Sequence, residues 1–549
     1  MPLQKNQVLT LQVERLSSDG SGVAHSPEGE TVFIPGAAPG DEARVRIVKD
    51  CKRYAFGILD EVLTPSPDRI PVDCAVAGPC GGCSLRHLDY AAELRAKQEN
   101  VADAFARIGG LDVPVLPIVG SPEIDRYRNK VQFPVGTDKA GRPCIGFYAG
   151  RTHRIVPCPD CRLQPGVLNE IGNTLCAFFA EKGIHPYNEE TGKGLVRHIF
   201  LRRGAHSGQI MVCLVCTRAK LPSADELCTR LKEAFPDIVT ILLNVNAKNT
   251  NVILGSETHT LYGQGYIEDT LCGVPVQLGP LSFYQVNTLA AEQLYGIAAE
   301  YAQLTPDDLL LDLYCGMGTI GLSMADHCRE LVGVEIVPEA IESAKANAAR
   351  MGAAVSAKSR FFCADAGQAA TQLAAEGLHP DVVMLDPPRK GCDEATLSAV
   401  VRMAPRRVVY VSCNPATAAR DAAWLEQNGY HAEKVQPVDL FPRTKHCETV
   451  CLLSKLNVKH HIEVEITMDE LDLTAAESKA TYDEIKAYVL EKFGFKVSQL
   501  YIAQIKRKCG IIERKNYNQS KKEDAKVPKC PPEKEAAIMD ALKHFQMIP

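Results

Sequence analysis

The sequence predicts a multidomain α/β protein that contains a doubly wound, Rossmann-like sheet. Short runs of alternating apolar and polar residues, separated by Gly, Pro and Asp turns, fill residues 1–62 and predict a small β-barrel. Helix and strand patterns are mixed over 63–275, which predicts a central α+β domain. From 276 to 455, apolar strand runs alternate with helical stretches, as in a parallel sheet. The rest, 456–549, is expected to be an appended α/β domain.

Composition limits the classes of function. Hydrophobic residues make up 46% and charged residues 23% of the chain, which is typical of soluble proteins. The net charge of −6 requires any nucleic-acid partner to be held by local basic patches. The N-terminus lacks the apolar core of a signal peptide and no apolar run has membrane-spanning length, so we expect a cytoplasmic protein without membrane contact. The oligomeric state is left open by the sequence, and a monomer is the expectation.

The barrel segment carries a cluster of cations on its expected third strand and the following turn. Two interpretations are equally weighted: a solvated strand face, or a surface that binds a nucleic-acid backbone. The segment resembles a TRAM domain, a barrel found in RNA-modifying enzymes, and this resemblance favours RNA. The cations are Arg44, Arg46, Lys49, Lys52 and Arg53.

Cysteines are numerous and locally clustered. The total of 21 is odd, which favours free thiols, catalysis or metal binding over a disulfide framework. Three of them, Cys74, Cys80 and Cys83, are separated partly by glycines and suit a soft metal centre. Cys158 or Cys161 could supply a fourth ligand. Spacing does not choose between zinc and a four-iron cluster, and unligated thiols are the third alternative. Downstream, residues 126–130 place cations beside an aromatic residue, a weak indication of RNA contact.

The region 276–455 carries a pattern typical of nucleotide-like ligands. The strand run 309–313 is followed by Gly316 and Gly318 and then a helix, so backbone N–H groups can approach a ligand closely. The turn lacks the full G-x-G-x-x-G fingerprint, which disfavours a dinucleotide. Glu335 ends the next strand, where a carboxylate can hold two ribose hydroxyls, and Asp386 ends a later one. This combination indicates S-adenosylmethionine.

Cys413 is the residue around which we interpret this region. It follows the apolar run 408–411 and precedes a helical segment, so it is expected at the carboxyl edge of the sheet. A thiolate there can attack an electron-poor carbon, although a buried strand-end thiol is the simpler alternative. After Asp386-Pro-Pro, methyltransferases that act on amines tend to have an aromatic residue. Arg389 stands there in this chain, which disfavours methylation of an exocyclic amine.

Four motifs together resemble the uracil-C5 RNA methyltransferase family over residues 5–455. They are residues 386–391, 411–415 and 283–287 and the cluster formed by Cys74, Cys80 and Cys83. The most similar branch carries a TRAM domain and an iron–sulfur cluster and acts on 23S ribosomal RNA. The resemblance implies that Cys413 is the nucleophile. It also implies that Glu448, in the segment 441–448, is the general base.

The same resemblance implies two ligand sets. S-adenosylmethionine would be held by Gln285, Tyr314, Glu335 and Asp386. A [4Fe-4S] cluster would be held by Cys74, Cys80, Cys83 and Cys161. Cys161 is preferred to Cys158 because residues 161–164 look like the ending of the family motif.

Each implied residue has a chemical purpose. Addition of the Cys413 thiolate to C6 of uracil makes C5 nucleophilic, and Glu448 would then remove the C5 proton after methylation. The base must lie in a loop or be flipped out of its stack, and Phe283 either packs internally, fills the stack or holds the ring. No residue is assigned as the donor that stabilises the enolate. Two alternatives remain: methylation of the T-loop of transfer RNA, and an inactive iron–sulfur RNA-binding protein.

The tail beyond 455 falls outside the family pattern. A strand is expected at 462–466, and a capping box at residue 481 predicts a helix whose Ile485, Val489 and Phe493 share one face and which ends at Gly494. Nine Lys or Arg and three Asp or Glu lie between Tyr501 and Cys530, in either a nucleic-acid-binding patch or a solvated loop. The role of this domain is not indicated.

Overall fold

The computed structural model describes residues 3–456 apart from 151 and 249, and then 482–509, 530–545 and 547–548. The chain divides into two compact units, 1–457 and 458–549. Among the helices of these described residues, none has both the length and the apolar character that a membrane span requires.

The N-terminal strands close into a barrel in the order β1-β2-β3-β5-β4, so the predicted barrel is confirmed. Alternation explains it, because Ala43, Val45 and Ile47 face the interior while Arg44 and Arg46 point outward. Both arginines form ion pairs with carboxylates of the adjacent strand, Arg44 with Glu61 and Arg46 with Asp60, each at 2.7 Å. The strands are β1 Val8–Leu16, β2 Ser21–His25, β3 Thr31–Pro35, β4 Glu42–Asp50 and β5 Tyr54–Thr64.

The central part contains a seven-stranded sheet in the order β12-β11-β10-β9-β6-β7-β8 and a separate two-stranded sheet. Strand β10 is buried along its whole length, and α2 packs its apolar face on β6, β7 and β9. The strands are β6 Lys130–Thr137, β7 Pro143–Tyr148, β8 Ile155–Pro157, β9 Val196–Arg203, β10 Ile210–Cys216, β11 Ile238–Val245, β12 Glu257–Tyr262, β13 Ile267–Leu271 and β14 Val274–Leu278. The helices are α1 Tyr90–Asp103 with its continuation η1 Ala104–Gly109, α2 Gly166–Glu181 and α3 Ala224–Ala234.

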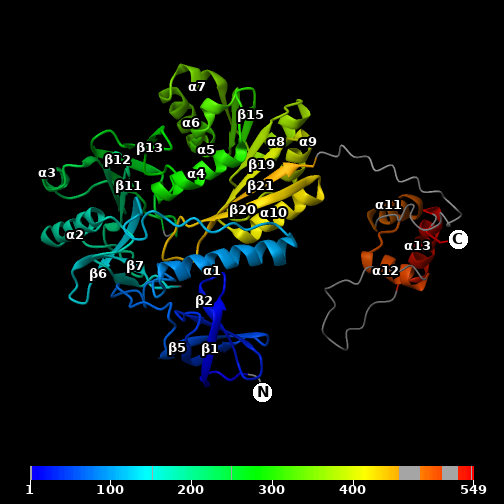
Figure 1. Ribbon diagram of the computed structural model, residues 1–549, viewed down its shortest axis with the longest axis horizontal. Helices are drawn as coiled ribbons and strands as arrows, with labels where there is room; N and C mark the ends of the chain where they lie inside the picture. The colour runs from blue at the N-terminus through cyan, green and yellow to red at the C-terminus, as the bar shows by residue number, and fades with distance from the viewer. Residues whose placement is uncertain are drawn as a thin grey trace. The chain divides into compact units, whose positions relative to one another are not determined.

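The third sheet is the predicted doubly wound one, with the order β17-β16-β15-β18-β19-β21-β20 (Figure 1). Strands β15 to β19 are parallel, and the hairpin β20–β21 adds an antiparallel edge beside β19. The strands are β15 Leu309–Leu313, β16 Glu330–Glu335, β17 Ser359–Cys363, β18 Val382–Leu385, β19 Arg407–Ser412, β20 Tyr430–Val438 and β21 Glu448–Lys455. The helices are α4 Thr288–Ala302, α5 Thr319–Ser323, α6 Pro338–Arg350, α7 Ala353–Lys358, α8 Ala366–Ala375, α9 Glu394–Met403 and α10 Pro415–Gln427.

The strand order reverses between β15 and β18, and helices cover both faces. Val409 and Val411 of β19 belong to the core that includes α4, whereas Val408 and Tyr410 belong to the core that includes α10. In open α/β sheets, ligands bind at the carboxyl ends of strands where the order reverses. The ends of β15, β16, β18 and β19 are therefore the place to look for a site.

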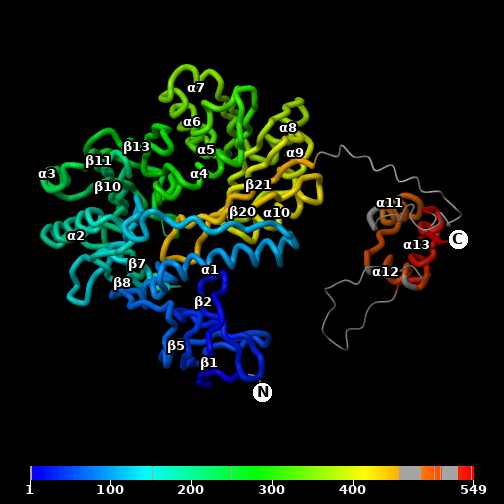
Figure 2. Tube along the Cα trace, viewed as in Figure 1, coloured from blue at the N-terminus to red at the C-terminus, as the bar shows by residue number. Residues whose placement is uncertain are grey.

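Helix α1, although distant in sequence, lies against this sheet (Figure 2). It contacts β20 and α10, and η1 packs on α10. The segment after it pairs with the outer strand, because Leu116 N–H donates to the Val435 carbonyl at 2.9 Å and Val119 N–H to the Pro437 carbonyl at 3.0 Å. Residues from the first quarter of the chain thus cover the free edge of β20.

The second unit, in its described residues, consists of α11 Tyr482–Phe493, α12 Gln499–Lys508 and α13 Pro532–His544. Ile485 and Val489 are buried in its core as expected, but Phe493 is on the exposed side. Gly494 follows α11 with a φ of 71°. The strand expected at 462–466, the capping residue 481 and the stretch 510–529 of the basic region lie outside the described residues.

Candidate active site

Cys413 lies at the carboxyl end of β19, in the turn that leads into α10. Asn414 caps the helix, since its side-chain oxygen accepts the Ala416 N–H at 3.2 Å, and Pro415 occupies the first turn. The strand end and the helix start together leave the Cys413 thiol half-buried at the edge of the sheet.

Glu448 begins the neighbouring strand β21 and faces Cys413. The two strands are antiparallel, and their pairing ends at Ser412 and Thr449, directly before Cys413 and directly after Glu448. The charge of Glu448 contributes to raising the pKa of Cys413, so the two side chains lie near each other. Glu448 is only 5% exposed. Burial, together with the charge of Asp386, raises the pKa of Glu448 to about 8.

Arg389, from the loop after β18, lies beside the Cys413 side chain. Burial and the nearby carboxylates raise the pKa of Cys413, and the contact with Arg389 offsets part of that shift. Helix α10 holds this loop in place. The Asn414 Nδ2 donates to the Arg389 carbonyl at 2.9 Å, and the Arg420 Nη2 donates to the Lys390 carbonyl at 3.0 Å. The helix after Cys413 therefore also fixes the cation beside it.

A cavity of about 540 Å³ opens beside Cys413. The barrel supplies Arg15, α1 supplies Lys97, and the connection between β20 and β21 supplies His446. Arg15 Nη1 also lies 3.6 Å from Asp103 Oδ2, which links the barrel to α1. The cations of the lining are Arg15, Lys97, Arg107, Arg389 and Lys445. A basic cavity of this size suits a polyanionic ligand.

Carboxylates collect on the other side of Cys413, at the ends of β15 and β18. Burial raises the pKa of Asp312 to about 8 and that of Asp386 to about 7. Asp312 Oδ2 accepts the Gly321 N–H at 3.0 Å, whereas its Oδ1 has no hydrogen-bond partner. A buried acceptor without a partner is rare in proteins and points to a donor from a bound ligand.

Glu335 ends β16 and is held by backbone N–H groups. These come from Gly316 at 3.2 Å, Ile336 at 2.9 Å and Val337 at 3.0 Å. Gly316 and Gly318 have φ values of 54° and 79°, a conformation that favours glycine and lets the turn approach a ligand. The Ile336 side chain is 60% exposed beside the carboxylate. In a ligand made of a flat ring and a hydroxylated sugar, the ring would cover Ile336 and the sugar hydroxyls would hydrogen-bond Glu335.

Gln285 and Tyr314, the other two residues expected at the cofactor site, contact different helices. The Gln285 side chain hydrogen-bonds the Tyr295 hydroxyl, which lies 3.3 Å from Thr319 Oγ1 at the start of α5. Tyr314 follows β15 with a φ of 67°, a strained conformation for a residue with a side chain. Its hydroxyl lies 3.4 Å from Thr396 Oγ1 of α9.

Phe283 and Tyr284 are neighbours with opposite environments. Tyr284 is buried and its hydroxyl donates to Asp269 Oδ2 at 3.1 Å, so it has a packing role. Phe283 is 72% exposed. An exposed aromatic ring is available to stack on a base.

The clustered cysteines lie within electrostatic reach of one another. Cys158 hydrogen-bonds Cys161, and the N–H groups of Leu163 and Gln164 also donate to it; these bonds outweigh burial and lower the pKa of Cys161 to about 6. Negative charge on Cys74 or Cys161 raises the pKa of Cys80 further above the value set by burial. Within the described ranges, however, no three His, Cys, Asp or Glu side chains are arranged as a ready metal site.

Arg86 stands beside these thiols. Burial raises the pKa of Cys83 to about 11, and a hydrogen bond from Arg86 opposes this increase. Arg86 is itself buried and fixed by Asp73, at 2.8 Å, and by Asp125. Hydrogen-bond donors aimed at thiols are what a thiolate cluster requires.

Residues 126–130, which the sequence suggested as an RNA contact, are engaged mainly inside the protein. Arg126 Nη1 donates to Asp160 at 2.6 Å and to the Cys161 carbonyl at 2.9 Å. The Tyr127 hydroxyl donates to the Pro442 carbonyl at 3.0 Å. Asn129 Nδ2 donates to the Gln285 carbonyl at 2.7 Å. The segment connects the cysteine region to the loops around Cys413.

Known proteins resemble this chain over most of its length. Residues 276–456 match the tRNA (uracil-5-)-methyltransferase family model, and residues 2–59 match the TRAM domain. An uncharacterized RNA methyltransferase from Halalkalibacterium halodurans is 43% identical over 457 residues, which is 83% of this chain and 99% of the relative. The chain belongs to the uracil-C5 RNA methyltransferase family. A similar relative from Bacillus cereus is 42% identical over 83% of this chain and 98% of its own.

A solved structure agrees with this membership. The tRNA (uracil-54, C5)-methyltransferase of Pyrococcus abyssi, in complex with S-adenosyl-L-homocysteine, has a TM-score of 0.65 and 27% identity. The similarity covers 81% of this chain and 100% of that one. The methyltransferase fold and the TRAM barrel predicted for this RNA methyltransferase are therefore confirmed.

The sequence did not reveal three side chains around Cys413 in this methyltransferase. They are Arg389, Lys97 and His446. Burial lowers the pKa of His446 to about 4, and the nearby cations, chiefly Arg389 and Lys445, contribute to this shift. The His446 ring is therefore neutral near pH 7. The cation after Asp386-Pro-Pro was a usable signal for Arg389. No local pattern marks Lys97 as part of the site, because its pairing with Glu93 four residues earlier is ordinary for a helix and its other charged partner, Asp439, lies more than three hundred residues away.

The raised pKa of Glu448 predicts a pH dependence of stability. The folded-state pKa of about 8 exceeds the ordinary 4.5, so stability falls as pH rises from about 4.5 through 8. Glu448→Gln removes this loss. Between pH 6 and pH 9 the variant should gain on the order of 2 kcal/mol relative to wild type, measured by urea unfolding at both values. A difference that is the same at both pH values would contradict the assignment.

Proposed function

We propose that this RNA methyltransferase converts a uridine of 23S ribosomal RNA to 5-methyluridine, with Cys413 as nucleophile and Glu448 as base. The observation that carries the proposal is the pairing of β19 with β21. That pairing ends at Ser412 and Thr449 and so supports a position of Glu448 beside Cys413 at the carboxyl edge of the sheet, near a basic cavity and a group of buried carboxylates.

The carboxylate side fits S-adenosylmethionine, the cofactor class seen as its demethylated form in the Pyrococcus abyssi relative. Glu335 would hold the ribose hydroxyls, and Ile336 would pack on the adenine. Asp386, Gln285 and Tyr314 would complete the site, and the free oxygen of Asp312 would accept a hydrogen bond. When bound, S-adenosylmethionine supplies an electrophilic methyl group.

Cys413 starts the chemistry on uracil. Its thiolate forms a bond to C6, and the electrons of the C5=C6 double bond move toward O4, which leaves C5 nucleophilic. Arg389 assists because its positive charge stabilises the thiolate against burial and the nearby carboxylates. The neutral thiol is favoured until substrate arrives, which limits side reactions.

Glu448 completes the reaction after C5 has gained the methyl group. Its carboxylate takes the C5 proton, the electrons re-form the C5=C6 double bond, and the C6–S bond breaks to release the Cys413 thiolate. A pKa raised to about 8 makes the carboxylate a stronger base than an exposed glutamate.

The substrate nucleotide must leave its stack to reach Cys413. The exposed Phe283 ring is suited to hold the uracil, and the cations of the cavity other than Lys97 are suited to the flanking phosphates. The family branch with a TRAM barrel and clustered cysteines supports ribosomal RNA. The transfer-RNA methyltransferase family model and the Pyrococcus abyssi tRNA methyltransferase support transfer RNA as the second candidate.

An RNA containing 5-fluorouridine tests the nucleophile. Fluorine at C5 cannot be removed as a proton, so the RNA should remain bonded to wild-type protein under denaturing conditions. Cys413→Ala should form no adduct and incorporate no labelled methyl group. Cys228→Ala, a control on α3, should behave as wild type. Adduct formation by Cys413→Ala would refute the assignment.

Unmodified transcripts of 23S ribosomal RNA and of a complete transfer RNA distinguish the two substrates. We expect kcat/KM for methyl transfer to be higher for the ribosomal transcript by about tenfold or more. Mass spectrometry of the digested RNA should locate 5-methyluridine. A preference for the transfer RNA, lost when its T-loop uridine is replaced by cytidine, would support the second candidate.

We also propose that Cys74, Cys80, Cys83 and Cys161 hold a [4Fe-4S] cluster. Their mutual electrostatic reach and the donors around Cys161 and Cys83 support this, although the thiols would have to draw together around the metal. The bound cluster would crosslink the loop 74–83 to the loop around Cys161.

Iron and sulfide analysis of anaerobically purified protein tests the cluster. Wild type and Cys158→Ser should contain both elements and absorb broadly in the visible range, whereas Cys161→Ser should not. If Cys158→Ser lost iron and sulfide and Cys161→Ser kept them, Cys158 would be the fourth ligand in place of Cys161. Zinc in place of iron and sulfide would refute the cluster and indicate a tetrahedral thiolate site.

A further inference from the structure

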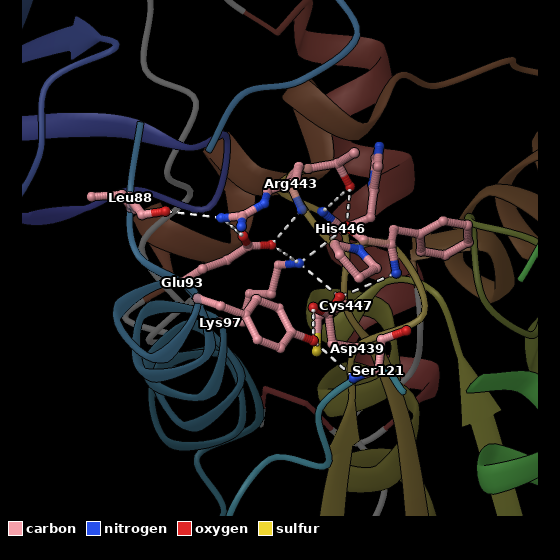
Figure 3. Close-up of polar contacts among 12 residues, drawn as sticks. Leu88, Glu93, Lys97, Ser121, Asp439, Arg443, His446 and Cys447 are labelled. Carbon is pink, nitrogen blue, oxygen red and sulfur yellow. Dashed lines mark hydrogen bonds and ion pairs between the residues drawn. The ribbon is translucent and has the colours of Figure 1, made fainter. Parts of the chain in front are cut away.

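A network of buried charges joins α1 to the connection between β20 and β21 (Figure 3). Glu93 and Lys97 come from α1, and Asp439 and Arg443 from the connection 439–447. Their exposed fractions are 0%, 2%, 0% and 6%. Two positive and two negative charges thus share one interior site about which the proposed chemistry says nothing.

Lys97 is the centre of this network. Its Nζ donates to Glu93 Oε1 at 2.8 Å, to Asp439 Oδ1 at 2.7 Å and to the Phe441 carbonyl at 3.1 Å. An ammonium group has three donors, and all three have partners here. Although Lys97 lines the cavity beside Cys413, none of its donors is left for an RNA phosphate.

The other members tie further points of the connection to the region of α1. The Arg443 N–H donates to Glu93 Oε1 at 2.7 Å, and its Nη1 donates to the Leu88 carbonyl at 2.9 Å. The Tyr90 hydroxyl donates to Asp439 Oδ2 at 2.9 Å. The connection 439–447 is therefore held at its beginning and in its middle by α1 and the residues before it.

The connection leads directly into Glu448. Val438, the residue just before the connection, pairs with Glu448 in the β20–β21 register. Asp439 therefore follows directly after the residue that pairs with Glu448. Cys447, the residue before Glu448, is buried next to the same network, since Lys97 and Asp439 both influence its pKa. Movement of the connection would move the carboxylate relative to Cys413.

Stability alone does not account for the network. Burying ions costs several kcal/mol of hydration for each one, and buried ion pairs are often replaceable by apolar residues without loss of stability. The charged groups instead fix the position of the connection 439–447, because each of their hydrogen bonds holds one of its atoms. Catalytic groups are sensitive to displacements of about 1 Å, which can cost about a hundredfold in rate.

We propose that Lys97 is a positioning residue that sets Glu448 for proton removal, so that α1 completes the active site. The inference rests on the proposed function. The affected step is transfer of the C5 proton to a Glu448 oxygen, with re-formation of the C5=C6 bond and departure of the Cys413 thiolate. Addition of that thiolate and methyl transfer precede this step and do not need Glu448.

The two RNAs separate these steps. With a 23S ribosomal RNA transcript that contains 5-fluorouridine, adduct formation reports on addition and methyl transfer alone. With the ordinary transcript, turnover also requires proton removal. Lys97→Met removes the ammonium but leaves two carboxylates short of a cation. Lys97→Met combined with Asp439→Asn removes one positive and one negative charge together, which protects folding, and thermal unfolding checks both variants.

We expect the double variant to trap the fluorinated RNA at a rate within about threefold of wild type. Its turnover of ordinary RNA should fall by about tenfold or more in kcat, with KM for RNA nearly unchanged, and methylated RNA should accumulate bonded to the protein. Lys345→Met, which removes an exposed ammonium on α6, is the matched control and should match wild type in both assays.

Equal losses in trapping and turnover would overturn the inference, because they indicate a general structural role. Unchanged turnover in a folded double variant, or a loss confined to KM, would overturn it as well. Failure of the wild-type protein to trap fluorinated RNA would instead refute the proposed function. The two failures are therefore distinguishable.

Discussion

The antiparallel pairing of β21 with β19 is the constraint on which the site depends. A parallel strand in that position would present its carboxyl end at the same edge as Cys413, and its first residue would lie at the opposite edge. Because β21 runs the other way, its first residue, Glu448, lies where β19 ends. Hydrogen bonds along both strands then hold Glu448 beside the turn that carries Cys413.

Acidic and basic side chains line different parts of the site around this pair. Asp312 and Asp386 are buried with their pKa values raised, and Asp312 retains a free oxygen. Cations from the barrel, α1 and the loops line the cavity on the other side. A positively charged sulfonium would be favoured on the first side and a phosphate backbone on the second, so each ligand is drawn to its own half of the site.

Local patterns in the sequence were sufficient to predict the secondary-structure elements and the polar residues at the ends of strands. Alternation predicted the barrel, and apolar runs that end in Glu335 and Asp386 predicted a parallel sheet whose carboxyl edge carries polar groups. The unusual cation after Asp386-Pro-Pro marked Arg389 but not its position beside Cys413, and the contacts of α1 with the connection 439–447 were not predictable in this way. Lys97 and Asp439 meet only after the chain has folded, and neither position has a periodicity that marks it. Phe493 fitted a helical face by spacing, but packing in the folded unit leaves it outside.

The segment after α1 limits which fragments of the enzyme can be made without exposing a sheet edge. Residues 114–119 provide the hydrogen-bond partners of β20, which is otherwise the open margin of the sheet. A fragment that starts at residue 276 would lack these partners and would present unpaired backbone groups to any similar strand, a recognised route to aggregation. We therefore expect a fragment limited to the domain that holds the cofactor pattern to be less soluble than a chain that also contains residues 114–119.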